Sequence, residues 1–243
     1  MSGIYGVILA GGTGTRMNNT EKPKQFLDLG GAPILIHTAE KFLAEPSFRE
    51  ILILVPKAWN SYTQDIIRKY LPEAEKIRVL NGGSSRNETI MNAISYIEEA
   101  GELSEDTIIV THDSVRPFVT RRILRENIRG AVEYGATDTV VPATDTIVRS
   151  TDSDTIEEIP ERKFLYQGQT PQSFHALQLK NLYEELRPEE KEILTDACKI
   201  LVLKGQQVKL VRGEQSNIKI TYPYDMTVAR ALLGLETEGE ETC

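Results

Sequence analysis

Short apolar runs alternate with longer amphipathic stretches over the first half of the chain. Ile4–Ala10 and Ile51–Val55 are almost wholly apolar and too short for helices, so they predict buried strands. Two further short runs, Ile77–Leu80 and Thr107–Thr111, predict strands as well. Between and after these runs, periodic patterns predict helices over Pro33–Phe42, Ser61–Leu71, Asn87–Glu99 and Arg121–Tyr134, with Pro33 at a helix start and Asn87 as a helix cap.

A strand and helix alternation of this kind predicts βαβ units. The fold class is therefore α/β: a Rossmann-like, mostly parallel sheet covered by helices on both faces. In such sheets ligands bind beyond the carboxyl ends of the strands, so motifs at those ends are the candidates for chemistry.

The pattern changes after Pro142. Short β-like pieces over Thr146–Val148, Thr155–Ile159 and Phe164–Tyr166 are separated by polar turn residues and predict a small β arm at about 143–167. We expect a single domain over 1–235 and an acidic tail over 236–243. The remaining elements are helices at Ala176–Leu186, Ala197–Leu203 and Asp225–Leu235, and strands at Val208–Val211 and Ile218–Thr221.

Composition narrows the function classes. The 243 residues carry a formal charge of −8, which argues against nucleic-acid binding because no domain-wide basic surface is available. The two cysteines, Cys198 and Cys243, belong to no zinc-ligand pattern and suit a reducing, cytoplasmic setting. We expect no signal peptide and no membrane insertion, since no apolar stretch approaches the roughly 20 residues that a span needs.

The stretch LAGGTGTRM, which follows the first strand, crowds Gly11, Gly12 and Gly14 ahead of Arg16. Glycines allow close approach to backbone N–H groups, which form anion-binding concavities at strand ends. A tight turn would explain one or two of them. The loop is neither a P-loop, which needs GK[ST], nor a dinucleotide fingerprint, because Met17 stands where glycine is required. The loop predicts phosphate binding but does not indicate which class of nucleotide-binding protein this is. Lys24, after Pro23, is either a surface charge or a second contact to the same phosphates.

Six blocks in order carry a family resemblance. GGTGTRM followed by PKQF resembles the sugar nucleotidyltransferases. The later blocks are similar to the cytidylyltransferases of polyol phosphates, which act on methylerythritol 4-phosphate or ribitol 5-phosphate. These are Gly82–Arg86 (GGSSR), Thr111–Pro117 (THDSVRP), Gln169–Gln172 (QTPQ) and Asn217–Thr221 (NIKIT). The resemblance implies that an acceptor phosphate attacks the α-phosphorus of CTP and releases pyrophosphate.

The resemblance also implies site residues. The cations Arg16, Lys24 and Lys219 would serve catalysis at the triphosphate, although Lys219 alone would be read as a strand-edge surface charge. The nucleotide would lie along the first glycine turn, and the second turn would read the cytosine with help from a nearby hydroxyl. The nucleotide-binding residues implied are Leu9, Ala10, Gly11, Gly12, Gly14, Gly82, Gly83, Ser84 and Thr89.

For the acceptor, the resemblance implies Asp113 near both the substrate and Mg²⁺, and Arg116 at the polyol phosphate. A structural ion pair is the alternative for Asp113, and His112 is expected to be neutral and structural. In the family the arm reaches a second subunit, so Arg162 would complete the partner's site in a homodimer. Thr195 would donate a hydrogen bond from its hydroxyl group to the polyol.

The identity of the acceptor is the least determined part of the predicted reaction. The stretch YQGQTPQSF and the valine of HDSVRPF look more like enzymes of D-ribitol 5-phosphate, whose product CDP-ribitol serves teichoic acid or capsule synthesis. The alternative is 2-C-methyl-D-erythritol 4-phosphate in isoprenoid precursor synthesis. A regulatory nucleotide-binding module would be expected to lose Lys24, Asp113 or Lys219, but this chain keeps all three. A hexose-1-phosphate nucleotidyltransferase is a further alternative, and the later blocks fit it poorly.

Overall fold

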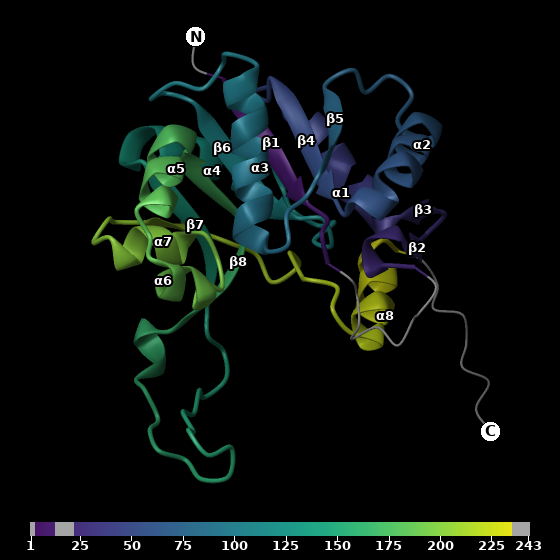
Figure 1. Ribbon diagram of the computed structural model, residues 1–243. Helices are drawn as coiled ribbons and strands as arrows, with labels where there is room; N and C mark the ends of the chain where they lie inside the picture. The colour runs from purple at the N-terminus through teal and green to yellow at the C-terminus, as the bar shows by residue number, and fades with distance from the viewer. Residues whose placement is uncertain (1–2, 13–21, 235–243) are drawn as a thin grey trace, which may run out of the picture.

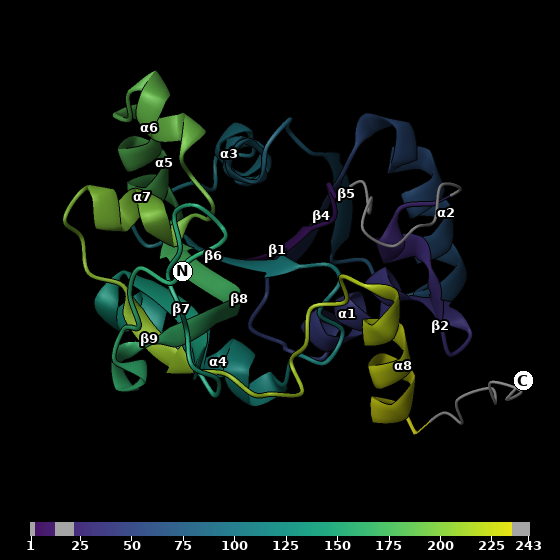
Figure 2. The ribbon, with the colours of Figure 1, turned by 90° about the horizontal axis from the view of Figure 1, so that it is seen from below.

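The computed structural model describes residues 3–12 and 22–234. Its centre is a seven-stranded sheet of order β5-β4-β1-β6-β8-β7-β9, and a two-stranded sheet pairs β2 (Asp28–Leu29) with β3 (Ala32–Pro33). Helices lie on both faces of the large sheet (Figures 1 and 2). The predicted α/β class with a mostly parallel, doubly covered sheet is confirmed.

Four parallel neighbours form the first half of the sheet: β5 (Ile77–Asn81), β4 (Glu50–Val55), β1 (Ile4–Leu9) and β6 (Ile108–Asp113). The sequences IYGVIL of β1 and EILILV of β4 are apolar on both faces because helices cover both faces. The carboxyl ends of β1 and β6 meet at one edge, where Leu9 pairs with Asp113.

The second half departs from the sequence expectation. β8 (Tyr166–His175) runs antiparallel between β6 and β7 (Ala136–Pro142), and β9 (Lys209–Arg212) pairs parallel with β7. The strands β7 and β8 were not predicted, because polar residues interrupt their apolar pattern. The strand predicted over Ile218–Thr221 is wrong: this stretch is irregular, and it crosses the end of the sheet.

Each face of the sheet has its own helices. One core cluster joins the sheet to α1 (Ile34–Leu43), α2 (Asn60–Tyr70) and α4 (Arg121–Tyr134), and a second joins it to α3 (Arg86–Glu99), α5 (Ala176–Glu184) and α7 (Cys198–Leu203). Figure 2 shows the two sets on opposite sides of the strands. The short α6 (Pro188–Glu192) follows α5, and α8 (Pro223–Leu232) packs near β2. Three single 3-10 turns complete the described elements, η2 (Lys24–Phe26), η3 (Lys57–Trp59) and η4 (Arg162–Phe164).

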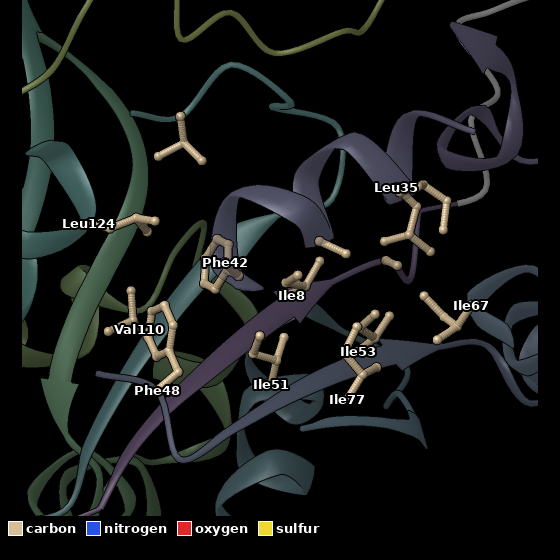
Figure 3. Close-up of a cluster of buried hydrophobic side chains, with 14 of the residues drawn as sticks. Ile8, Leu35, Phe42, Phe48, Ile51, Ile53, Ile67, Ile77, Val110 and Leu124 are labelled. Carbon is tan, nitrogen blue, oxygen red and sulfur yellow. The ribbon is translucent and has the colours of Figure 1, made fainter. Parts of the chain in front are cut away.

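The core beneath α1 is closely packed. Ile8, Ile51 and Val110 project from adjacent strands toward Phe42 of α1, which stacks on Phe48 with ring centroids 5.1 Å apart (Figure 3). Burying each such side chain contributes roughly 1.5–3 kcal/mol. This packing fixes the strands whose carboxyl ends carry the polar residues considered below.

Residues 143–165, called the arm below, leave the sheet between β7 and β8 and extend away from it (Figure 1). The three β-like pieces expected there do not form strands. The arm holds one isolated bridge, between Arg149 and Glu158, and the 3-10 turn η4. No described helix combines the length and the apolar character that a membrane span requires.

Candidate active site

A cleft of about 400 Å³ opens at the carboxyl ends of β1 and β6, beside the N-terminus of α3. This position is where ligands bind in sheets of this kind. The described residues that line the cleft come from five segments of the chain: Leu9, Gly11, Gly12, Lys24, Gln25, Gly83, Ser84, Ser85, Arg86, Thr89, Asp113, Ser114, Val115, Lys219 and Thr221.

The first glycine turn is held by a glutamine that sequence reasoning passed over. The buried Gln25 donates from Nε2 to the carbonyl of Ala10 at 2.7 Å and to that of Gly12 at 3.1 Å. Gly11 and Gly12 themselves are exposed to the cleft. Gly14, predicted to bind the nucleotide, and Arg16, predicted to serve catalysis at the triphosphate, lie outside the described residues.

The second glycine turn is shaped by Thr89. Its Oγ1 accepts from the backbone N–H of Gly83 at 3.0 Å and donates to the carbonyl of Ser85 at 2.8 Å. A Cβ on Gly83 would lie 2.5 Å from that of Glu88, so the turn leaves no room for a side chain. Ser85, not Asn87, caps α3 by accepting from the N–H of Glu88.

Asp113 is the centre of the charge arrangement in the cleft. Its buried carboxylate pairs with Arg86 at Oδ1 and, at Oδ2, with Lys219 at 2.9 Å and Arg116 at 3.4 Å. Burial by itself would raise the pKa of the Asp113 carboxyl, but the charges of Arg86, Lys219 and Arg116 together hold that pKa well below its usual range. The group therefore stays ionised and keeps three cations at one end of the sheet.

Hydrogen bonds made by His112 and Arg116 hold this charged cluster in place. His112, fully buried, shares hydrogen bonds with the carbonyl of Arg116 at 3.0 Å and the hydroxyl of Thr170 at 2.9 Å. Burial lowers the pKa of His112 to about 4, so the ring is neutral near pH 7, in agreement with the structural role predicted for it. Arg116 donates to the carbonyl of Asn217 at 2.7 Å, which fastens the NIKIT stretch to β6.

The NIKIT stretch brings two distant lysines to the cleft. Lys24 donates from Nζ to the carbonyl of Ile220 at 3.0 Å, and Lys219 reaches Asp113. Among the described lining residues there are three cations, Lys24, Arg86 and Lys219, and Asp113 is the one carboxylate. An acidic chain thus presents a locally positive cleft, which suits polyanionic ligands.

The structure gathers many of the predicted site residues. Nine of them line the cleft: Leu9, Gly11, Gly12, Lys24, Gly83, Ser84, Thr89, Asp113 and Lys219. Three others do not line the cleft but adjoin residues that do: the carbonyl of Ala10 accepts from Gln25, Arg116 pairs with Asp113, and Gly82 precedes Gly83 in the chain. Arg162 donates to the carbonyl of Thr144 within the arm, and Thr195 is exposed ahead of α7, so neither lines the cleft of its own chain.

Arg86 is the main charged residue of the cleft that the sequence analysis did not single out. It closes the quoted GGSSR block, and its position in the first turn of α3 aims it across to β6. The available signal was a cation immediately after a glycine turn, the same signal that pointed to Arg16.

As arranged, the described side chains do not fit a metal held by protein alone. No group of three or more histidine, cysteine or acidic side chains comes together among the described residues, and both oxygens of Asp113 already contact cations. The magnesium role of Asp113 stays a prediction.

A model of the 2-C-methyl-D-erythritol 4-phosphate cytidylyltransferase family matches residues 4–235. The chain belongs to this family. The protein is a cytidylyltransferase, and so a nucleotidyltransferase.

Solved structures agree with the family membership. The chain resembles 4-diphosphocytidyl-2C-methyl-D-erythritol synthase from Anaerococcus prevotii at 26% identity and a TM-score of 0.77, covering 96% of this chain and 99% of that one. It resembles the 2-C-methyl-D-erythritol 4-phosphate cytidylyltransferase of Francisella tularensis at 26% identity and a TM-score of 0.78, covering 95% and 99%. The fold is also that of the Thermus thermophilus protein, at a TM-score of 0.73 and 24% identity over 97% and 100%.

Proposed function

We propose that this cytidylyltransferase transfers the cytidylyl group of CTP to D-ribitol 5-phosphate and releases CDP-ribitol and pyrophosphate. The observation that carries cytidylyl transfer is the set of cations around Asp113 beside two glycine turns. The acceptor rests on the sequence stretch YQGQTPQSF and on Val115, which lines the cleft.

The chemistry requires charge neutralisation more than proton transfer. The acceptor phosphate is already an anion, so no strong base is needed to form the nucleophile. The obstacle is the approach of two anions while charge grows at the α-phosphate and on the leaving pyrophosphate. Lys24 and Lys219, held by the NIKIT stretch, would stabilise this charge at the α-phosphate.

The remaining parts would position the two substrates. The N–H groups at Gly11 and Gly12 would lie along the nucleotide, and the turn at Gly83 would present backbone groups to the cytosine. Arg86 and Arg116, fixed by Asp113, would hold the acceptor phosphate in line for attack. Because Asp113 prealigns these cations before substrates arrive, little reorganisation is needed during the reaction.

Methylerythritol 4-phosphate is the second candidate acceptor, and the comparisons favour it, since the matched family and its solved structures bear that name. The two acceptors differ by a methyl branch and a hydroxyl. A site built to hydrogen-bond a hydroxyl rejects an analogue lacking it by about 10⁴- to 10⁵-fold.

A competition experiment decides between them. The protein is incubated with CTP, Mg²⁺ and equal amounts of both polyol phosphates, and the products are identified by mass spectrometry. We expect CDP-ribitol to dominate. Predominant formation of the cytidyl methylerythritol product would replace this proposal with the second candidate.

Enzymes of this family generally use divalent cations. We propose Mg²⁺ here, bound chiefly by the substrate phosphates, with Asp113 approaching it once ligands draw Arg86 or Lys219 away. Mg²⁺ prefers one or two carboxylates together with phosphate oxygens.

A homodimer with exchanged arms is proposed as the working unit. Large apolar side chains are exposed along the arm, namely Ile147, Val148, Ile156, Ile159 and Phe164, and also at Tyr166, where β8 begins. Exposed apolar groups concentrated on one segment are typical of an interaction surface. Arg162 in this arm would then reach the partner's cleft, and Thr195 would contact the polyol in its own chain.

A further inference from the structure

A row of polar side chains crosses the sheet beside the cleft. Thr111 of β6, Gln172 of β8 and Asp138 of β7 are register partners, so their side chains leave the sheet on the same face. The next row on that face is apolar and lies in the core under α3, α5 and α7; it consists of Ile109, Phe174 and Ala136. The change from apolar to polar marks where this face stops being core.

The polar row is continuous with the cleft. Asp113 lies two residues beyond Thr111 on β6, which places it about 7 Å further along the same face. Arg86 joins the two places: it pairs with Asp113, and its positive charge also acts on the carboxyl of Asp138. A ligand with its phosphate at the cations could therefore extend its other end over the polar row.

Some polar atoms in and beside this row have no hydrogen-bond partner among the described residues. Gln172, 3% exposed, donates from Nε2 to Oδ1 of Asp138 at 3.0 Å, but its buried Oε1 has no partner among the described residues. The same holds for the buried Nε of Arg86. A hydroxyl group both donates and accepts, so it can satisfy an oxygen acceptor and a nitrogen donor together.

The carboxylate in this row is kept at a cost to stability. Burial, and then the nearby charge of Asp196, raise the pKa of Asp138 to about 6. Asp196 precedes α7 and accepts from the N–H of Lys199 at 3.0 Å. Cys198 faces the same place from α7, and burial followed by the charge of Asp138 raises the pKa of its thiol. A partly buried carboxylate whose ionisation opposes folding is a common mark of a functional site.

We propose that Asp138 and Gln172 bind hydroxyl groups of the acceptor's polyol chain and so determine specificity for a hydroxyl-rich polyol phosphate. This inference rests on the proposed function, because it takes the acceptor to be a polyol phosphate placed with its phosphate beside Asp113. Asp138 and Gln172 touch the substrate away from the reacting atoms, so their effect falls on acceptor binding and not on CTP.

The test compares Asp138→Asn and Gln172→Leu with wild type and with Asp106→Asn, a change at an exposed aspartate in the turn before β6. In both test variants we expect the KM for ribitol 5-phosphate to rise at least about 10-fold, the effect of losing one charged or well-aligned hydrogen bond. The KM for CTP should change less than about 2-fold. An unchanged KM for the polyol phosphate in both variants overturns the proposal.

Thermal unfolding separates this role from a structural one. The folded pKa of Asp138 lies above its ordinary value, so its ionisation lowers stability once the pH rises above about 4 and reaches the full effect above about 6. Asp138→Asn should therefore raise Tm at pH 8 and leave it unchanged at pH 4. A lower Tm at pH 8 together with weaker binding of both substrates would make Asp138 a structural residue.

The same assays keep the two proposals distinct. If wild type uses methylerythritol 4-phosphate instead, the ribitol proposal fails. The variants are then measured with that acceptor, which still carries hydroxyl groups. A selective rise in its KM supports hydroxyl binding by Asp138 and Gln172, and an unchanged KM refutes it.

Discussion

At the scale of single residues, the site depends on one carboxylate that organises several cations. Asp113 is nearly inaccessible, yet it remains ionised because Arg86, Lys219 and Arg116 surround it. Without substrate it balances charges that would otherwise repel one another. When substrates bind, their phosphates can neutralise the same positive charges.

Replacing Asp113 by Asn should destabilise the protein in a pH-dependent way. Its pKa in the folded protein is lowered, so the stabilisation is fully present above about pH 4 and is lost as the pH falls further. Removing one partner of a buried ion pair costs about 3–5 kcal/mol. Thermal unfolding should therefore show a lower Tm for Asp113→Asn at pH 7 and a smaller difference at pH 2.5. An equal Tm at pH 7 would mean that the cations do not depend on this carboxylate.

A substitution at Lys24 tests the catalytic role proposed for the cations of the cleft. Its amine lies in the cleft, and we expect Lys24→Ala to reduce kcat by at least about 100-fold, as for the loss of one donor to developing charge. Lys57→Ala, at an exposed lysine in η3, is the matched control and should retain wild-type kcat. Near-normal turnover by Lys24→Ala would contradict the role given to it.

At the scale of elements, turns at the ends of strands do most of the positioning. The turn between β5 and α3 is built by Thr89 and by the absence of a side chain at Gly83. A methyl group there would meet the Cβ of Glu88 at 2.5 Å and the backbone carbon of that residue at 2.9 Å. Neither contact can be relieved by a flexible side chain.

Gly83→Ala should therefore displace the turn and weaken CTP binding. We expect the KM for CTP to rise about 10-fold or more, since the loss of a single well-placed hydrogen bond is of that order. The change is measured by steady-state kinetics with CTP varied. Gly101→Ala is a control at a surface glycine with open space around it, although its positive φ predicts a small loss of stability. Unchanged KM for CTP in Gly83→Ala would show that the nucleotide does not use this turn.

The arm is the element whose role depends on a second chain. If Arg162 serves the partner's cleft, then Arg162→Ala homodimers and Lys24→Ala homodimers are each impaired. Mixed dimers would contain one site with both residues intact. Unfolding and refolding an equimolar mixture should then restore up to about a quarter of wild-type activity by random assortment. Activity no higher than the mean of the two variants would show that sites are not shared.

The apolar pattern predicted the regular part of the fold for a physical reason, whereas the residues expected at the cleft came from the family resemblance. Buried parallel strands such as β1 and β4 are apolar on both faces, which no other short element matches. β8 was missed because polar residues interrupt the apolar pattern of its sequence YQGQTPQSFH, although it pairs with strands on both sides. Ile218–Thr221 looked like a strand, but Lys24 holds it at the carbonyl of Ile220 and Arg116 holds the preceding Asn217. Arg86 needed the fold, since only the meeting of β6 and α3 places it on Asp113.

At the scale of the whole molecule, the fold assembles a positive cleft from segments separated by nearly 200 residues in an acidic chain. Lys24 reaches the carbonyl of Ile220 across a sequence separation of 196, and family membership makes the molecule a cytidylyltransferase. The central claim is that these cations drive cytidylyl transfer to a polyol phosphate.

The most direct test measures pyrophosphate release from CTP and Mg²⁺, with and without ribitol 5-phosphate, in wild type and in Lys219→Met. We predict release by wild type only when the polyol phosphate is present, and a loss of at least about 100-fold in Lys219→Met. Release that is independent of the polyol phosphate, or that survives unchanged in Lys219→Met, would contradict the claim.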